Sequence, residues 1–388
     1  MRCISLFLLV CTILMVGCSK PSELPLKTDL FVSGEGDYAF YRIPGIVVTT
    51  EGTILAYCEA RRDSKHDWST LDVLMRRSTD GGETWSEPYV VSNVPGPKEE
   101  NPVGLTAGYG EPYGPTYNNP VAIADRDGTV HLLYCLEYMR CFYTRSEDDG
   151  LTFSEPVEIT DVIEKFRDEY VWKVLSTGPG HGIQLKNGRL VVGIRLADAK
   201  GPHPLGNTAV STIYSDDGGQ SWKRGEIAIE HNEETLNPNE PIVVELTDGS
   251  VMMNVRNESA AKRRLVTISP DGATDWSEPY FDEALWDSGV MAAIVRIDDS
   301  TIAFANPHAL KGRKNLSIKL SFDDGKTWPV DEVIEPGPSA YPDLAVLPDG
   351  TILCFYERGS VDGEELYGRI TLSQIDAGWL EHQANSDD

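Results

Sequence analysis

Residues 41–61, YRIPGIVVTTEGTILAYCEAR, decide how this chain of 388 residues is organised. An arginine-containing turn leads into the β-branched run GIVV, which reverses at Glu51-Gly52 and returns as the apolar run TILAYCEA. Two such runs with glycine at the reversal predict a β-hairpin. The pattern recurs at residues 120–137, 182–196, 241–257, 292–308 and 343–359. A unit repeated at intervals of about 50–76 residues indicates a solenoid, a propeller or an array.

A second repeat alternates with these hairpins. The pattern Ser-x-Asp-x-Gly-x-Thr-Trp follows four of the first five, and a worn copy, SPDGATDW at residues 269–276, follows the other. The four better copies are STDGGETW at 78–85, SEDDGLTF at 146–153, SDDGGQSW at 215–222 and SFDDGKTW at 321–328. An Asp side chain in such a Gly-containing turn accepts backbone N–H bonds, so each box is interpreted as a structural staple.

Each hairpin, together with the box that follows it, predicts a unit of four antiparallel strands. Six units then predict an all-β fold, a six-bladed β-propeller formed by a single domain over residues 29–388. The sixth unit has a third strand but no box, so it lacks its outermost strand. We expect residues 30–33 to fill that place and close the ring, which would leave no open edge.

The first residues have a different character. Residues 1–18 combine Arg2, an apolar run and the lipobox form Met15-Val-Gly-Cys18, which predict a lipoprotein signal peptide and lipidation at Cys18. Residues 19–28 are predicted to be a tether, so we expect an exported protein anchored by lipid to the membrane, on the periplasmic side or at the cell surface. An ordinary signal peptide is the alternative.

The net charge of −27 argues against nucleic acid as a partner. No metal-ligand spacing is visible, and we expect no metal or cofactor.

Strand order places the unusual residues at one end of the propeller axis. Residues just before first strands or just after second strands share one face, because successive strands run in opposite directions. Arginines from three units, two acids and a tyrosine fall there. Arginines gathered at one point repel one another unless an anion lies between them, and the guanidinium group binds carboxylates in a bidentate manner. A carboxylate ligand is therefore predicted.

Several motifs together resemble a bacterial exo-α-sialidase (neuraminidase) with Asp-box, or BNR, repeats. They are YRIP at 41–44, the boxes, GPGHGIQL at 178–185, NEP at 239–241 and AYPDLAVLPDGTI at 340–352. The resemblance runs from about residue 30 to the end of the chain. It implies an arginine triad at Arg42, Arg256 and Arg313, a nucleophile at Tyr341 with its partner Glu240, and an acid/base residue at Asp67. It also implies that Glu357 steadies the first arginine.

These roles make chemical sense for a sugar whose carboxylate lies on the anomeric carbon. An anionic nucleophile would approach that charge at a cost of about 4 kcal/mol at 4 Å and an effective dielectric constant near 20. A neutral tyrosine avoids this repulsion, and sialidases are the tyrosine exception among glycosidases.

Some positions stay open from the sequence alone. Asp63 and Asp72 compete with Asp67 as the acid, and Arg62 competes with Arg61 as a further substrate contact. Asn119 is a candidate substrate contact, whereas His181 is interpreted as a structural or pocket-wall residue. Trp68 and Trp172 are expected to border the pocket or to pack inside the protein.

The resemblance implies a retaining exo-α-sialidase acting on sialylated glycoproteins, glycolipids and oligosaccharides. Two alternatives keep the ligand class. One is a hydrolase of a related ulosonic acid glycoside, such as deaminated sialic acid, and the other is a non-catalytic propeller that binds sialoglycans. A scaffold for protein partners is a third alternative. Linkage preference, transfer instead of hydrolysis, and oligomeric state are not encoded in these motifs.

Overall fold

The structure is a computed structural model that describes residues 25–384, apart from residue 65 and the segments 107–113, 202–204 and 360–366. The predicted signal peptide, the lipidation of Cys18 and most of the predicted tether lie outside the described residues and stay predictions. Residues 26–28, assigned to the tether from the sequence, lie in strand β1. No helix among the described residues is long and apolar enough to cross a membrane.

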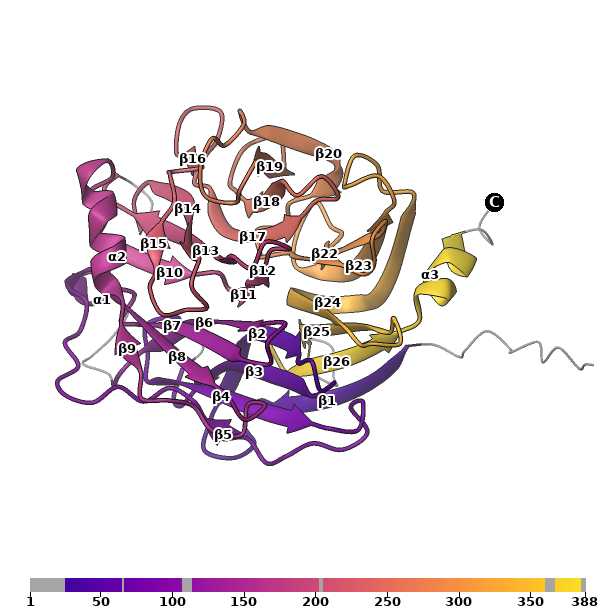
Figure 1. The fold of residues 1–388 in the computed structure, drawn as a ribbon, viewed down its shortest axis with the longest axis horizontal. Helices are drawn as coiled ribbons and strands as arrows, with labels where there is room; N and C mark the ends of the chain where they lie inside the picture. The colour runs from indigo at the N-terminus through magenta and orange to yellow at the C-terminus, as the bar shows by residue number, and fades with distance from the viewer. Residues whose placement is uncertain (1–24, 65, 107–113, 202–204, 360–366, 385–388) are drawn as a thin grey trace, which may run out of the picture.

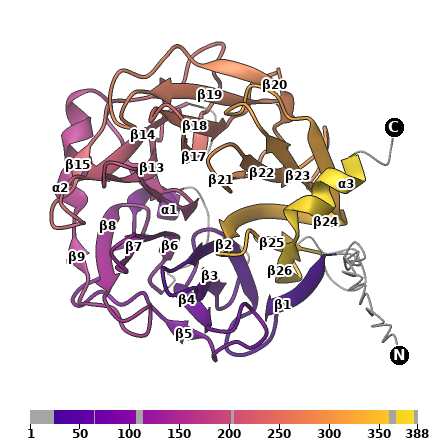
Figure 2. The same ribbon diagram turned by 45° about the vertical axis from the view of Figure 1, so that its right-hand side comes forward.

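Four sheets of four to six strands surround a common centre (Figure 2). The first contains β2 (Phe40–Val48), β3 (Ile54–Arg61), β4 (Leu71–Ser78) and β5 (Tyr89–Val90). The second contains β11 (Gly180–His181), β6 (Tyr117–Ala124), β7 (Val130–Leu136), β8 (Arg140–Ser146) and β9 (Val157–Glu158). The third contains β10 (Val174–Thr177), β12 (Ile183–Gln184), β13 (Leu190–Ala197), β14 (Thr208–Ser215), β15 (Lys223–Arg224) and β16 (Ile229–Glu230). The fourth contains β17 (Asn239–Glu245), β18 (Val251–Arg256), β19 (Arg263–Ser269) and β20 (Tyr280–Trp286).

The fifth sheet has seven strands and completes the circle (Figure 1). Its strands are, in order, β1 (Leu26–Val32), β26 (Arg369–Ile375), β25 (Ile352–Arg358), β24 (Val330–Val346), β23 (Lys314–Ser321), β22 (Ile302–Pro307) and β21 (Ala293–Arg296). The described helices are short, namely α1 (Pro102–Thr106), α2 (Thr160–Glu164), a 3₁₀ helix (Lys165–Asp168) and α3 (Ala377–Ala384).

The prediction of six four-stranded blades is wrong. The described strands form four propeller-like sheets and one seven-stranded sheet, because β24 is continuous over 17 residues. Its first half pairs with β23 and its second half pairs with β25, so the predicted fifth and sixth units merge into one curved sheet. Pro336 and Pro338 lie within this strand, although prolines normally interrupt strands. The predicted pairing of the N-terminal segment with the last strand is confirmed, since β1 lies antiparallel to β26.

The boxes form the predicted turns. In the first box, the hydroxyl of Ser78 accepts a bond from the Gly82 N–H at 2.8 Å and donates to Asp80 at 2.7 Å. The same carboxylate accepts from the backbone N–H of Thr84 at 2.9 Å. The worn box still makes a turn, but one residue shorter, with the Gly272 N–H bonded to the hydroxyl of Ser269 at 3.0 Å. The boxes therefore satisfy their own backbone polar groups, as expected of staples.

Candidate active site

Four bulges in the inner strands position the site. Ile43, Asn119, Glu240 and Tyr341 all have positive φ, between 31° and 58°, and each lies directly before a proline. The strand pairing shifts register at each of these positions, in β2, β6, β17 and β24. A bulge changes the direction of a side chain, and a positive φ in a residue other than glycine stores strain that clusters at functional sites. The sheets thus place strained positions around the same end of the axis.

Tyr341 and Glu240 form the centre of the site. The Tyr341 hydroxyl donates to one carboxylate oxygen of Glu240 at 2.8 Å, and Arg256 Nη1 lies 2.8 Å from the other. The same Arg256 nitrogen is 3.1 Å from the Tyr341 hydroxyl. All three side chains are largely buried. This geometry gives the phenol a base that can take its proton.

Two more arginines flank the phenol ring. The guanidinium carbons of Arg42 and Arg313 lie 5.2 Å and 5.4 Å from the centroid of the Tyr341 ring. Arg42 is held by Glu357, at 3.0 Å from its Nε, and Arg313 bonds to the Gly289 carbonyl at 2.9 Å. The predicted triad therefore meets around Tyr341, although its members come from three different sheets.

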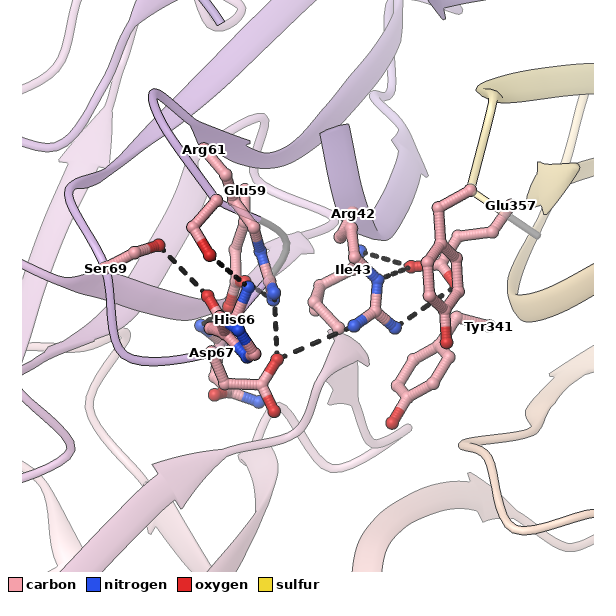
Figure 3. Close-up of polar contacts among 12 residues, drawn as sticks. Arg42, Ile43, Glu59, Arg61, His66, Asp67, Ser69, Tyr341 and Glu357 are labelled. Carbon is pink, nitrogen blue, oxygen red and sulfur yellow. Dashed lines mark hydrogen bonds and ion pairs between the residues drawn. The ribbon is translucent and has the colours of Figure 1, made fainter. Parts of the chain in front are cut away.

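Asp67 lies beside this group. One of its oxygens is 2.9 Å from Arg61 Nη1 and 3.5 Å from Arg42 Nη1. Both contacts are drawn as dashed lines in Figure 3. Its side chain is 59% exposed, whereas both arginines are buried. Arg61 is held in turn by Glu59 at 2.7 Å, and Glu59 also accepts the backbone N–H of Asn119 at 2.8 Å. Asp67 is thus a solvent-accessible carboxylate whose position is held by two buried arginines.

These charges set the protonation of the three reactive groups. Burial disfavours ionisation of Glu240, but Arg256 outweighs it and holds the pKa of Glu240 below its ordinary value. Burial, and then Glu240, raise the pKa of Tyr341, so the phenol is neutral in the free protein. Desolvation by the surrounding side chains disfavours ionisation of Asp67, yet Arg61 and Arg42 together lower the pKa of this carboxyl.

The geometry separates the candidates that the sequence leaves open. The side chains of Asp72 and Arg62 pair with each other at 2.7 Å beside Tyr38. Asp67 instead pairs with Arg61 and Arg42, two arginines of the site. Trp68 lines a cavity of about 50 Å³ together with Asn119, Glu240 and Tyr341.

Two other candidates lie elsewhere. Trp172 belongs to a hydrophobic cluster with Phe166 and does not line that cavity. His181 lies on β11, and its Nδ1 is 2.7 Å from a carboxylate oxygen of Asp343. It lines a larger cavity, of about 360 Å³, among the opposite ends of the inner strands. The interpretation of His181 as a structural or wall residue agrees with this placement.

Sequence reasoning missed two residues of the site, Glu59 and Arg195. Glu59 is fully buried and links Arg61 to Asn119. Arg195 lies on β13 and lines the same small cavity as Asp67 and Tyr341. Each is a charged residue inside a strand of mostly apolar residues, namely ILAYCEAR for Glu59 and LVVGIRLA for Arg195. Because charged residues are rarely buried without a partner, that pattern was the available signal.

Comparison with known proteins agrees with the fold and the repeats. The BNR repeat-like domain family matches residues 110–354, and the BNR/Asp-box repeat matches residues 76–87. A sialidase from Micromonospora viridifaciens is 31% identical over 376 residues, which cover 88% of this chain and 53% of the relative. A sialidase from Bacteroides fragilis (strain YCH46) is 30% identical over 359 residues, covering 84% and 61%. The chain thus spans about half to three fifths of the length of these relatives.

Solved structures share the fold at lower identity. A Hadza microbial sialidase superposes with a TM-score of 0.73 at 24% identity, over 92% of this chain and 69% of the other. A Trypanosoma rangeli sialidase in complex with 2,3-difluorosialic acid gives 0.71 at 17% identity, over 93% and 60%. From the family match over residues 110–354 and these relatives, the chain belongs to the bacterial sialidase family with BNR repeats.

Proposed function

We propose that this protein is a retaining exo-α-sialidase that hydrolyses terminal sialic acid from glycoconjugates. Both the Micromonospora and the Bacteroides relatives are sialidases. The observation that carries the proposal is the bond from the Tyr341 hydroxyl to Glu240, with three arginines around the same ring. A phenol paired with a carboxylate beside clustered guanidinium groups suits attack on a carbon that bears a carboxylate.

The arginines would bind the sugar carboxylate. Among the described residues, Nε of Arg256 is buried without a hydrogen-bond partner, so this arginine retains an unused donor. Charge-assisted hydrogen bonds contribute about 1.5–3 kcal/mol each. Glu357 holds Arg42 and Gly289 holds Arg313, so both are oriented before the ligand arrives, which lowers the entropic cost of binding.

In the first chemical step, the Tyr341 oxygen attacks the anomeric carbon and its proton passes to Glu240. The bond to the leaving oxygen breaks as Asp67 donates a proton to that oxygen. The raised pKa of Tyr341 keeps the nucleophile uncharged until this moment, so it does not repel the sugar carboxylate. The product is a tyrosyl-linked sugar and a free aglycone.

In the second step, ionised Asp67 takes a proton from water, whose oxygen attacks the same carbon. The bond to Tyr341 breaks and Glu240 returns the proton to the phenolate. Two inversions give net retention. Arg61 and Arg42 favour the ionised form of Asp67 that this step needs.

The first test replaces the nucleophile. Tyr341→Phe removes a single oxygen, and release of a fluorogenic aglycone from a sialoside is expected to fall below detection. Tyr280→Phe is the matched control, because Tyr280 is 44% exposed and lies on β20, away from the site. Proton NMR of the wild-type reaction should show the α-anomer of the sugar first. Binding of sialosides without turnover by the wild type would contradict the proposal, as would initial release of the β-anomer.

A further inference from the structure

Arg195 is a buried arginine at the edge of the site without a carboxylate partner among the described residues. It lies on β13 between Ser176 of β10 and Val210 of β14 and is only 7% exposed. Nη1 lies 3.2 Å from the side-chain oxygen of Asn239, and Nε is buried without a hydrogen-bond partner in the described structure. Yet it lines the same cavity as Tyr341.

Three of the other site arginines differ in this respect, whereas Arg313 bonds to the Gly289 carbonyl and the Tyr367 hydroxyl. Arg42 is held by Glu357, Arg61 by Glu59 and Arg256 by Glu240, at 2.7 to 3.0 Å. A guanidinium group carries five N–H donors, and leaving buried donors unused is costly. A ligand that supplies the missing acceptor would remove the free-energy cost of these unpaired N–H donors.

The position of Arg195 relative to the other site arginines indicates which part of a bound ligand it would contact. The three arginines assigned to the sugar carboxylate come from β2, from β18 and from the residue before β23. Arg195 comes from β13, in a sheet that contributes none of them. Beside it the cavity wall is formed by Trp68, Tyr138 and Val174, all of which are buried. A sugar whose carboxylate is bound by those three arginines would therefore meet Arg195 with another of its substituents.

We infer that Arg195 determines substrate specificity by donating hydrogen bonds to an uncharged acceptor oxygen on a substituent remote from the sugar carboxylate. This inference rests on the proposed sialidase function. Asp67 and Glu240 line the same cavity, so a second anionic group is disfavoured there. A sialic acid offers such oxygens in two places, the acyl carbonyl or hydroxyl at C5 and the hydroxyls of the glycerol side chain.

Glycosides that differ in one substituent test this directly. Wild type and Arg195→Met are compared on three substrates with the same fluorogenic aglycone, namely the N-acetylated sugar, its analogue with hydrogen in place of the C5 acylamino group, and the N-acetylated sugar with the glycerol chain removed. On substrates that keep the acceptor, the variant is expected to lose about 10- to 100-fold in kcat/KM, mainly through KM. On the substrate that lacks it, the loss should shrink to about threefold or less, which identifies the substituent.

Two controls separate specificity from positioning. Arg145→Met makes the same change at an arginine whose side chain is 39% exposed and paired with Glu147, and it should leave all three rates unchanged. Arg195→Lys keeps the charge without the forked donors and should give an intermediate loss. An equal loss of kcat on all three substrates, reproduced by Asn239→Ala, would overturn the inference, because Arg195 would then act only by holding the residue next to Glu240. No loss in Arg195→Met, while the wild type is active, would overturn it too. Wild-type inactivity on every substrate would instead refute the proposed function.

Discussion

At the level of single residues, the protonation of Asp67 is the property on which the proposed reaction depends most closely. Its proposed role needs the protonated form in the first step and the ionised form in the second. In the free protein Arg61 and Arg42 hold its pKa low, so kcat/KM is expected to fall as pH rises above that pKa. A bound substrate carboxylate would offset the charge of Arg42, and the pKa of Asp67 would then rise within the complex. Binding itself would thus favour the acid form.

Replacing this acid should affect substrates according to their leaving groups. With Asp67→Asn, a sialoside with a sugar aglycone is expected to react about 10²–10⁴-fold more slowly, because its oxygen must receive a proton. A p-nitrophenyl sialoside needs no such proton, so its first step should change much less. The values of kcat/KM on both substrates, which report only this first step, measure the difference. Asp72→Asn serves as the control, since Asp72 pairs with Arg62 instead. Equal losses on both substrates would refute the acid role.

At the scale of single elements, the four bulges explain how β strands form a site. Ile43, Asn119, Glu240 and Tyr341 each combine a positive φ with a following proline. Such backbone conformations cost about 1–3 kcal/mol each and persist only where surrounding structure enforces them. The Ile43 N–H, for instance, donates to Glu357 at 3.0 Å. The ends of the inner strands are therefore locally strained, and the sheets behind them supply the stability.

A buried ion pair connects β24, one of these inner strands, to β11. His181 on β11 bonds to Asp343, which lies two residues after Tyr341 on β24 and also accepts the Ile46 N–H at 2.9 Å. Burial disfavours the charged imidazole, but Asp343 outweighs it and raises the pKa of His181 above 6.5. The folded state then binds this proton more tightly than the unfolded state does.

The sign of the resulting pH effect follows from that raised pKa. The stabilisation is complete below pH 6.5, the ordinary pKa, and is lost as pH rises through the higher pKa of the folded state. The free-energy difference between wild type and His181→Gln, from urea unfolding, should therefore shrink with rising pH above 6.5. His66→Gln, at an exposed position, is the control. A difference that stays constant from pH 5 to pH 9 would contradict the expectation.

Particular elements show what the sequence could and could not predict. The hairpins and boxes could be predicted because glycine turns and alternating apolar residues are patterns within short stretches of the sequence. The triad residues were readable through motifs such as YRIP, and the structure brings them together. The continuity of β24 was not readable, because prolines normally mark breaks and here lie within one long strand. The sequence marks Arg195 only as a charged residue inside an apolar strand, and its significance depends on which partners surround it in space.

At the scale of the whole molecule, closure of the circle depends on β1. This strand pairs with β26, and its Asp29 bonds to Arg369 at 2.8 Å. Arg76 of β4 donates to the Leu30 carbonyl at 2.6 Å, so β1 also joins the seven-stranded sheet to its neighbour. Leu30 and Phe31 are 4% and 3% exposed and lie in one hydrophobic cluster with residues of both sheets.

Removal of β1 should therefore destabilise the entire protein. Burial of Leu30 and Phe31 contributes about 1.5–3 kcal/mol each, a large part of the roughly 5–15 kcal/mol that stabilises a folded protein. A chain starting at Ser33 is expected to melt at a lower temperature than one starting at Leu26, and to self-associate through the exposed edge of β26. Thermal unfolding and light scattering measure the two effects. The double variant Leu30→Ala, Phe31→Ala should melt at an intermediate temperature without self-association, because its backbone still covers that edge. Equal melting temperatures and monomeric behaviour in both truncations would show that the circle holds without this strand.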